Sequence, residues 1–180
     1  MTVTATNLEP LSRNARPVFL VPADTTNVAA GKTVSASNTN LSPHTLSKIT
    51  DTKIFPLGDD SCVEVGQGKQ WVQIDLAQEF KILAVLVWHC YAKDNIFFDV
   101  VVQISPDANF QKEVTTIYNN DADNTLGLGA GMDRNYYETY EGKLIDAKGA
   151  KGRYVRLYSN GNTRNLSNQY MEIEVHGRSR

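Results

Sequence analysis

An aromatic and hydrogen-bonding run follows the longest apolar segment of this chain: Trp88-His89-Cys90-Tyr91-Ala92-Lys93-Asp94-Asn95. Aromatic rings present a flat apolar face, and the imidazole and ammonium groups beside them form directional hydrogen bonds. A sugar needs both, because its axial C–H groups stack on rings while its hydroxyls require directional partners. The run therefore predicts that His89 and Tyr91 contact a sugar and that Lys93 donates to a hydroxyl. The alternative is that Trp88 and Tyr91 are core edges and that His89 is a polar residue with a protein partner.

A second polar run, Asn160-Gly161-Asn162-Thr163-Arg164-Asn165-Leu166-Ser167-Asn168, lies near the C-terminus. Asn160-Gly161 by itself signals a turn, but the loop continues with amide, hydroxyl and guanidinium groups. Arg and Asn side chains can grip adjacent sugar hydroxyls, so we expect Arg164 and Asn165 to donate to the ligand. We expect Glu64 to accept from one more hydroxyl. The alternative is a solvated polar loop.

Catalytic motifs are missing from the sequence. The three histidines do not form a zinc-binding helix motif, and no nucleophile elbow is present. The glycine-rich segment 127–131 does not follow a strand or open a helix, so it is a flexible loop rather than a phosphate loop. We therefore expect a protein that is not an enzyme. A small hydrolase remains the alternative, and it would require a deep pocket with convergent carboxylates.

Short apolar runs alternate with polar loops along most of the chain, and these runs have a period of two. In the last of them Met171, Ile173 and Val175 lie opposite Glu172 and Glu174. No window of about 12 residues predicts an amphipathic helix with caps. The candidate strands are 33–36, 71–76, 82–88, 97–104, 114–118, 143–145, 154–158 and 171–176. Eight or so strands without intervening helices predict an all-β protein, an antiparallel β-sandwich or jelly roll.

Length and composition indicate one globular domain. The chain has 180 residues, of which 41% are hydrophobic and 21% charged. Residues 1–26 have no clear periodicity and contain three prolines, so they are a lead-in or linker, and residues 27–180 form the domain. A formal net charge of -2 gives no long-range attraction for nucleic acid. Cys62 and Cys90 are the only cysteines, and we expect two unpaired thiols, although a bridge forms if their two loops meet.

Four segments together resemble the discoidin family, which comprises the coagulation-factor type C domains and the family 32 carbohydrate-binding modules. The resemblance runs from about residue 27 to residue 177, and the segments that carry it are 27–37, Trp71-Val72-Gln73-Ile74-Asp75-Leu76, 152–158 and 170–177. It implies a galactose-binding-like jelly roll that binds carbohydrate without catalysis, through loops at one end of the sandwich. It also implies a module of a larger exported bacterial protein, so an extracellular or periplasmic location. The alternative is an adhesion or scaffold module that binds a protein or lipid surface.

The resemblance further implies one structural calcium ion, held between a loop and a glutamate of the last strand. Asp51 matches the first carboxylate of the family's Asp-Gly-Asp pattern, and Glu172 matches the late glutamate. The chain departs from the pattern where Thr52 replaces the glycine and Lys53 replaces the second acid. Calcium takes six to eight oxygens, whereas an ammonium group can neutralise the two carboxylates directly. Retention and loss of the ion both stay open.

We expect no insertion into a membrane. The apolar residues Ile54, Phe55 and Leu57 stand next to Asp59 and Asp60, and no basic cluster compensates for these acids. An anionic membrane surface would repel such a loop. Packing under the loop explains its apolar residues better.

Overall fold

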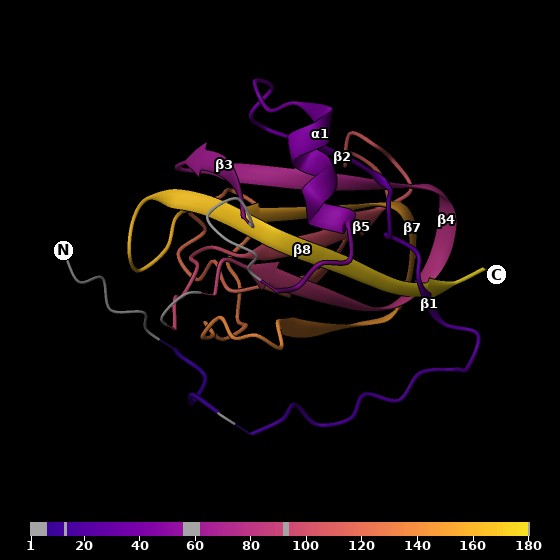
Figure 1. Cartoon of the computed structure of the whole chain (residues 1–180), viewed down its shortest axis with the longest axis horizontal. Helices are drawn as coiled ribbons and strands as arrows, with labels where there is room; N and C mark the ends of the chain where they lie inside the picture. The colour runs from indigo at the N-terminus through magenta and orange to yellow at the C-terminus, as the bar shows by residue number, and fades with distance from the viewer. Residues whose placement is uncertain (1–6, 13, 56–61, 92–93, 180) are drawn as a thin grey trace.

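The structure is a computed structural model that describes residues 7–12, 14–55, 62–91 and 94–179. These residues form an antiparallel β-sandwich with one short α-helix (Figure 1). The strands are β1 (Thr26–Asn27), β2 (Thr33–Ala36), β3 (Val63–Gln67), β4 (Gln70–His89), β5 (Val101–Ser105), β6 (Thr115–Asn119), β7 (Lys143–Ser159) and β8 (Ser167–Arg178). Helix α1 (Pro43–Leu46) continues into a 3-10 turn, Ser47–Thr50.

Two long strands, β4 and β7, organise the whole sandwich. They pair with each other along most of their length, and the pairing shifts register between Asp75 and Phe80. At this point Ala77 has a φ of 71°, so the chain bends sharply there. Figure 1 shows the resulting curve of β4 at the right-hand end. The bend lets each of the two strands contribute to both layers of the sandwich.

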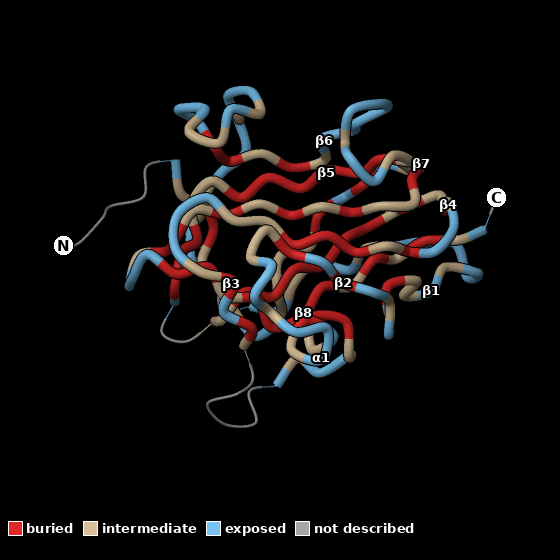
Figure 2. The backbone as a smooth tube through the Cα atoms, turned by 90° about the horizontal axis from the view of Figure 1, so that it is seen from above, coloured by how far each residue is buried: buried red, intermediate tan, exposed pale blue. Residues whose placement is uncertain are grey.

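The other strands attach to one half of this pair or the other. The first half of β4 pairs with β2, and the second half of β7 pairs with β5, which in turn carries β6. The second half of β4 pairs with β8, which carries β1 and β3 at its two ends. Side chains from both layers meet in one apolar core, which includes Ile74, Ile82, Val85, Leu157 and Ile173. In Figure 2 the buried backbone follows the strands, and much of the exposed backbone lies in the loops.

Helix α1 begins with a capping interaction that the sequence encodes. The Ser42 hydroxyl accepts a hydrogen bond from the Thr45 backbone N–H at 3.1 Å, and Pro43 occupies the first helical turn. The buried side chains of Leu46 and Ile49 attach this short segment to the core. Among the described residues no helix has the length and apolar composition to cross a bilayer.

The predicted strands match the observed ones unevenly. The prediction for 33–36 is confirmed in full, whereas 71–76 and 82–88 prove to be two halves of one strand, β4. Likewise 143–145 and 154–158 belong to a single strand, β7. Strand β3 was missed, because Glu64 and Gly66 interrupt its apolar pattern and a register shift separates them.

The connections that follow β4 and β7 gather at the end of the sandwich opposite the β4 bend. The pairs Gln70↔Ser159 and His89↔Tyr170 show that the start and the end of β4 both reach this end. The start of β8 lies there as well, beside β3. We call this end the loop end; it carries residues 90–91, 94–100 and 160–166 and the turn between β3 and β4.

Candidate functional site

A disulfide joins the two cysteines at the loop end. Cys62 and Cys90 are bonded, with their Cα atoms 6.0 Å apart, so the expectation of two unpaired thiols is wrong. Cys62 precedes β3 and Cys90 follows β4, and both strands pair with the beginning of β8. That shared partner brings the two residues together although 28 positions separate them. The bond ties the segment before β3 to the segment that carries Tyr91.

His89 lies inside the sandwich and not on its surface. Its side chain is 0% exposed, and its Nδ1 lies 2.6 Å from Glu138 Oε1. Its ring stacks on Phe97 with 4.3 Å between centroids and lies 4.6 Å from the Tyr170 ring. A fully buried ring cannot touch a surface ligand, so the predicted contact between His89 and a sugar is corrected. The alternative, a polar residue with a protein partner, describes His89.

Strand parity explains why His89 points inward. Val85, Val87 and His89 alternate along β4, and the two valines belong to the core between the layers. Trp88 points to the other face, where its indole N–H donates to the Tyr140 carbonyl at 2.9 Å. There it packs in a small apolar cluster with Leu86 and Met171.

Tyr91 stays at the surface but is only half-exposed. Its hydroxyl donates to the Ile54 carbonyl at 3.1 Å, and burial raises its pKa. Together with Asp94 and Tyr140 it lines a cleft of about 420 Å³. The Tyr91 ring is partly buried against the cluster of Leu86, Trp88 and Met171, and part of it faces this cleft. Lys93 lies outside the described residues.

The loop that carries Arg164 and Asn165 is cross-linked by its own amides. Asn162 Oδ1 accepts from the backbone N–H groups of both residues, at 2.8 and 3.1 Å. Asn165 Oδ1 in turn accepts from Asn162 Nδ2 and from the Ser167 N–H, each at 2.9 Å. Both Arg164 and Asn165 are exposed. Because both acceptor positions of Asn165 Oδ1 are occupied by hydrogen bonds within the loop, only the NH₂ group of Asn165 can hydrogen-bond to a ligand.

Glu64 lies beside this loop, on the neighbouring strand β3. Its Oε1 accepts from the Ser167 hydroxyl at 2.9 Å, and its Oε2 is 3.4 Å from Gln169 Nε2. Ser167 links it directly to Asn165. The structure thus brings Glu64, Arg164 and Asn165 together on one exposed surface, with Tyr91 at the same end of the sandwich.

The residues of the predicted calcium loop lie close together, with Lys53 beside Asp51 and Thr52 beside Glu172. Lys53 Nζ lies 3.2 Å from Asp51 Oδ2, and the Lys53 N–H donates to Asp51 Oδ1. Thr52 has a φ of 69°, the conformation that a glycine adopts without strain, and its N–H donates to Glu172 Oε2 at 3.1 Å. Burial raises the pKa of Glu172 to about 9, and the nearby Asp51 carboxylate contributes. Among the described residues Glu172 Oε1 is buried without a hydrogen-bond partner, so it is one oxygen of the six to eight that calcium takes.

Another acidic group lies where β5 and β6 meet the loop end. Oxygens of Asp99, Asp121 and Asp123 come within 4.8 Å of one another. The two oxygens of Asp121 each accept a backbone N–H, from Thr125 and Leu126 at 2.8 Å. Burial raises the pKa of Asp99. These hydrogen bonds hold the loop that follows β6.

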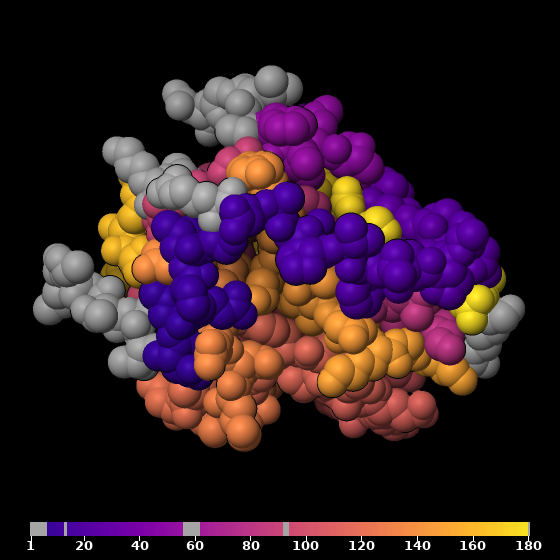
Figure 3. Space-filling view, turned by 90° about the horizontal axis from the view of Figure 1, so that it is seen from below, coloured from indigo at the N-terminus to yellow at the C-terminus, as the bar shows by residue number. Residues whose placement is uncertain are grey.

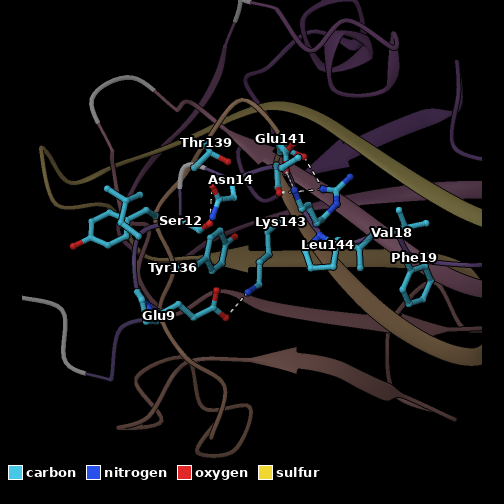
Figure 4. A pocket seen from close by; sticks show the side chains of 17 residues that line it. Glu9, Ser12, Asn14, Val18, Phe19, Tyr136, Thr139, Glu141, Lys143 and Leu144 are labelled. Carbon is cyan, nitrogen blue, oxygen red and sulfur yellow. Dashed lines mark hydrogen bonds and ion pairs between the residues drawn. The ribbon is translucent and has the colours of Figure 1, made fainter.

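A cleft of about 440 Å³ separates the lead-in from the segment that opens β7 (Figure 4). Tyr136 and Lys143 lie on one side of it and Glu9 on the other, and Lys143 Nζ is 2.5 Å from Glu9 Oε1. Glu141 closes a further edge, where its Oε2 accepts the Arg16 N–H at 2.7 Å. The sequence did not predict this cleft, because it depends on contacts between residues more than 100 positions apart.

Comparison with solved structures identifies the architecture. Chitosan-binding module 1 of a Paenibacillus sp. IK-5 chitosanase/glucanase is 20% identical, with a TM-score of 0.57 over 84% of this chain and 98% of that one. The lectin binding domain of lectinolysin, complexed with Lewis b, is 18% identical, with a TM-score of 0.59 over 88% of this chain and 100% of that one. A truncated AlyQ with CBM32 and alginate lyase domains is 15% identical, with a TM-score of 0.56 over 82% of this chain and 32% of that one.

The chain has the fold of a family 32 carbohydrate-binding module. No family model matches the sequence, and no curated protein matches it. At this level of identity the likeness establishes the galactose-binding-like β-sandwich that the sequence predicted.

Proposed function

We propose that this domain is a non-catalytic carbohydrate-binding module whose sugar site lies at the loop end. The observation that carries the proposal is that Arg164, Asn165 and Glu64 are exposed close together at the loop end. Hydrogen bonds within the loop 160–166, and from Ser167 to Glu64, hold this group in place. Tyr91 lies at the same end of the sandwich. A guanidinium, an amide and a carboxylate offer donors and acceptors to sugar hydroxyls, and the tyrosine ring offers an apolar face. Lys93 joins them in this proposal as a further donor.

The modules with this fold support the same ligand class. One of the similar structures is described as chitosan-binding, and another holds a Lewis b glycan. His89 supports the site from beneath, because its ring packs against Phe97 and Tyr170 under the loop end. An open site on loops buries little of its ligand, so the affinity for a single sugar is weak.

The domain acts, in this proposal, as one part of a larger exported protein. In AlyQ the comparable module accompanies an alginate lyase domain. The Cys62–Cys90 disulfide supports export, because disulfides persist in oxidising compartments and are rare in the cytosol.

The ammonium group of Lys53, rather than calcium, neutralises the carboxylate of Asp51 in this proposal. Its contact at 3.2 Å supports this role. Calcium then leaves the melting temperature of the wild type unchanged, while Lys53→Asp makes the melting temperature rise with added calcium. Melting curves with calcium and with a chelator test both statements. A wild-type melting temperature that falls in chelator contradicts the role of Lys53.

A glycan-array screen of three proteins tests the sugar site. Arg164→Ala removes a guanidinium at the loop end, and Arg178→Ala removes one at the end of β8, at the opposite side of the domain. We expect the wild type and Arg178→Ala to bind the same glycans and Arg164→Ala to lose at least a factor of about 10, the cost of one charged hydrogen bond. Equal binding by all three proteins refutes the assignment to the loop end. No binding to any glycan by the folded wild type refutes the carbohydrate function and favours a protein partner.

A further inference from the structure

The lead-in is anchored to the domain at two separate points. At the first, Leu8 pairs with Asn135, and the Glu9 N–H donates to the Asn135 carbonyl at 2.8 Å. At the second, the backbone N–H of Arg16 donates to Glu141 Oε2 at 2.7 Å, and the Arg16 guanidinium donates to the Glu141 carbonyl at 2.8 Å. The stretch between the two anchors therefore forms an arch that is held at both ends. Figure 3 shows the lead-in lying across this face of the molecule.

The described residues of the arch that line the space beneath it include three small side chains. Ser12, Asn14 and Ala15 are exposed, and none is large enough to fill the space. Pro10 and Pro17, which flank the anchors, restrict the backbone to extended conformations. The cleft of about 440 Å³ lies between this arch and residues 136–144, and its volume is within the range of roughly 300–1,000 Å³ typical of ligand pockets.

The charged groups around the cleft balance one another. Lys143 pairs with Glu9, and its ammonium also lies 4.9 Å from the centre of the Tyr136 ring. Arg16 is hydrogen-bonded to Glu141 on the opposite edge. The two cations and two carboxylates of the described lining sum to zero charge, so these four residues together give no preference for an ion.

The chemistry of the lining fits a neutral polyhydroxylated ligand. Sugar hydroxyls donate and accept at once, and here carboxylates and cationic N–H groups alternate around one space, with Ser12, Asn14 and Thr139 adding neutral partners (Figure 4). Phe19, Tyr137 and Leu144 supply the apolar part of the lining. This combination of apolar surface with a few convergent polar groups is typical of small-molecule sites.

We propose that this cleft is a second saccharide site, which takes one neutral unit of a glycan between the lead-in and the domain. It shares the ligand class of the proposed function and rests on it in that respect. Its lining contains neither Tyr91 nor Arg164, Asn165 and Glu64, but Ser12, Asn14 and Thr139 also line the neighbouring cleft beside Tyr91. The lead-in is then part of a binding surface and not only a connection. The module holds a glycan at two places, which raises its avidity over that of either site alone.

Backbone-amide NMR titrations test this site separately from the loop end. The probes are lactose, cellobiose and N,N′-diacetylchitobiose, added to the whole isotope-labelled chain. The reporters of the cleft are the amides of Glu9, Arg16 and Gly142, and the reporters of the loop end are those of Arg164 and Asn165. Ala15→Trp fills the cleft without removing any of its ion pairs, and Ala15→Ser is the matched control.

We expect at least one disaccharide to shift the cleft amides in a saturable way in the wild type, in Ala15→Ser and in Arg164→Ala. The same shifts disappear in Ala15→Trp. Cleft amides that do not move with any probe overturn the second site, whether or not the loop-end amides move. Cleft shifts that persist in Ala15→Trp overturn it as well. Loop-end amides that stay still while the cleft amides move refute the proposed loop-end site alone.

Discussion

At the scale of single residues, two histidine–glutamate pairs show how burial decides the role of a side chain. His89 and Glu138 are 2.6 Å apart and both fully buried, whereas His176 and Glu174 are 2.8 Å apart with side chains 29% and 22% exposed. Water screens the second pair but not the first. Removing one partner of a buried pair leaves the other polar group without a hydrogen bond in the core.

His89→Ala should therefore lower the free energy of unfolding by about 3–5 kcal/mol, the usual cost of breaking a buried pair. His176→Ala should cost about 1 kcal/mol or less, as partly exposed pairs do. Urea unfolding of both variants measures the difference. Equal losses in the two variants contradict a structural role for His89.

Of the residues that the sequence suggested for a sugar site, the structure places Arg164, Asn165 and Glu64 on the surface and His89 in the core. Arg164, Asn165 and Glu64 are polar residues in or beside turns, and such residues stay exposed in most folds. His89 could have been placed inside by its parity with Val85 and Val87. Its partner Glu138 is 49 positions away, and no local pattern connects the two. The disulfide was missed for the same reason.

At the scale of elements, the turn that opens β7 is fitted to the surface of β4. Gly142 has a φ of 66°, and a Cβ atom there would lie 2.5 Å from Cε2 of Trp88. Gly68, in the turn between β3 and β4, has a φ of 71° with nothing within 4 Å of the same position. The two glycines share the backbone conformation and differ only in what surrounds them.

Gly68→Ala should cost about 1 kcal/mol of stability, the strain of a left-handed conformation for an L-residue. Gly142→Ala should cost about 1–3 kcal/mol more, because the new methyl group overlaps the indole ring. Thermal unfolding measures both costs, and tryptophan fluorescence should change only in Gly142→Ala. Similar costs for the two variants contradict the close packing of Trp88 under Gly142.

The predicted boundaries were correct for β2, which lies in one layer of the sandwich. They were wrong for β4 and β7, which pass from one layer to the other. Residues 33–36 alternate cleanly between exposed and buried, as predicted. In β4 the residues around Ala77 interrupt the apolar alternation at the bend, so the sequence predicted two strands where there is one. Only pairing with β7 makes it continuous.

At the scale of the whole molecule, two kinds of surface adjoin each other, because Ser12 and Asn14 of the lead-in line one cleft together with Tyr91. The loop end groups exposed polar side chains on cross-linked loops, and the lead-in covers a different surface with a cleft beneath it. Periodicity predicted the sandwich because each straight part of its strands alternates with a period of two. The course of residues 7–25 along the domain was not predictable, since it depends on scattered ion pairs such as Glu9–Lys143.

The central claim is that a sugar binds at the loop end. A crystal structure of the domain with the glycan that binds best on the array tests it most directly. We expect a sugar ring against Tyr91, with hydroxyls within hydrogen-bond distance of Arg164 and of Glu64 or Asn165. A glycan bound away from these residues, on the outer face of the sheets or only in the lead-in cleft, contradicts it.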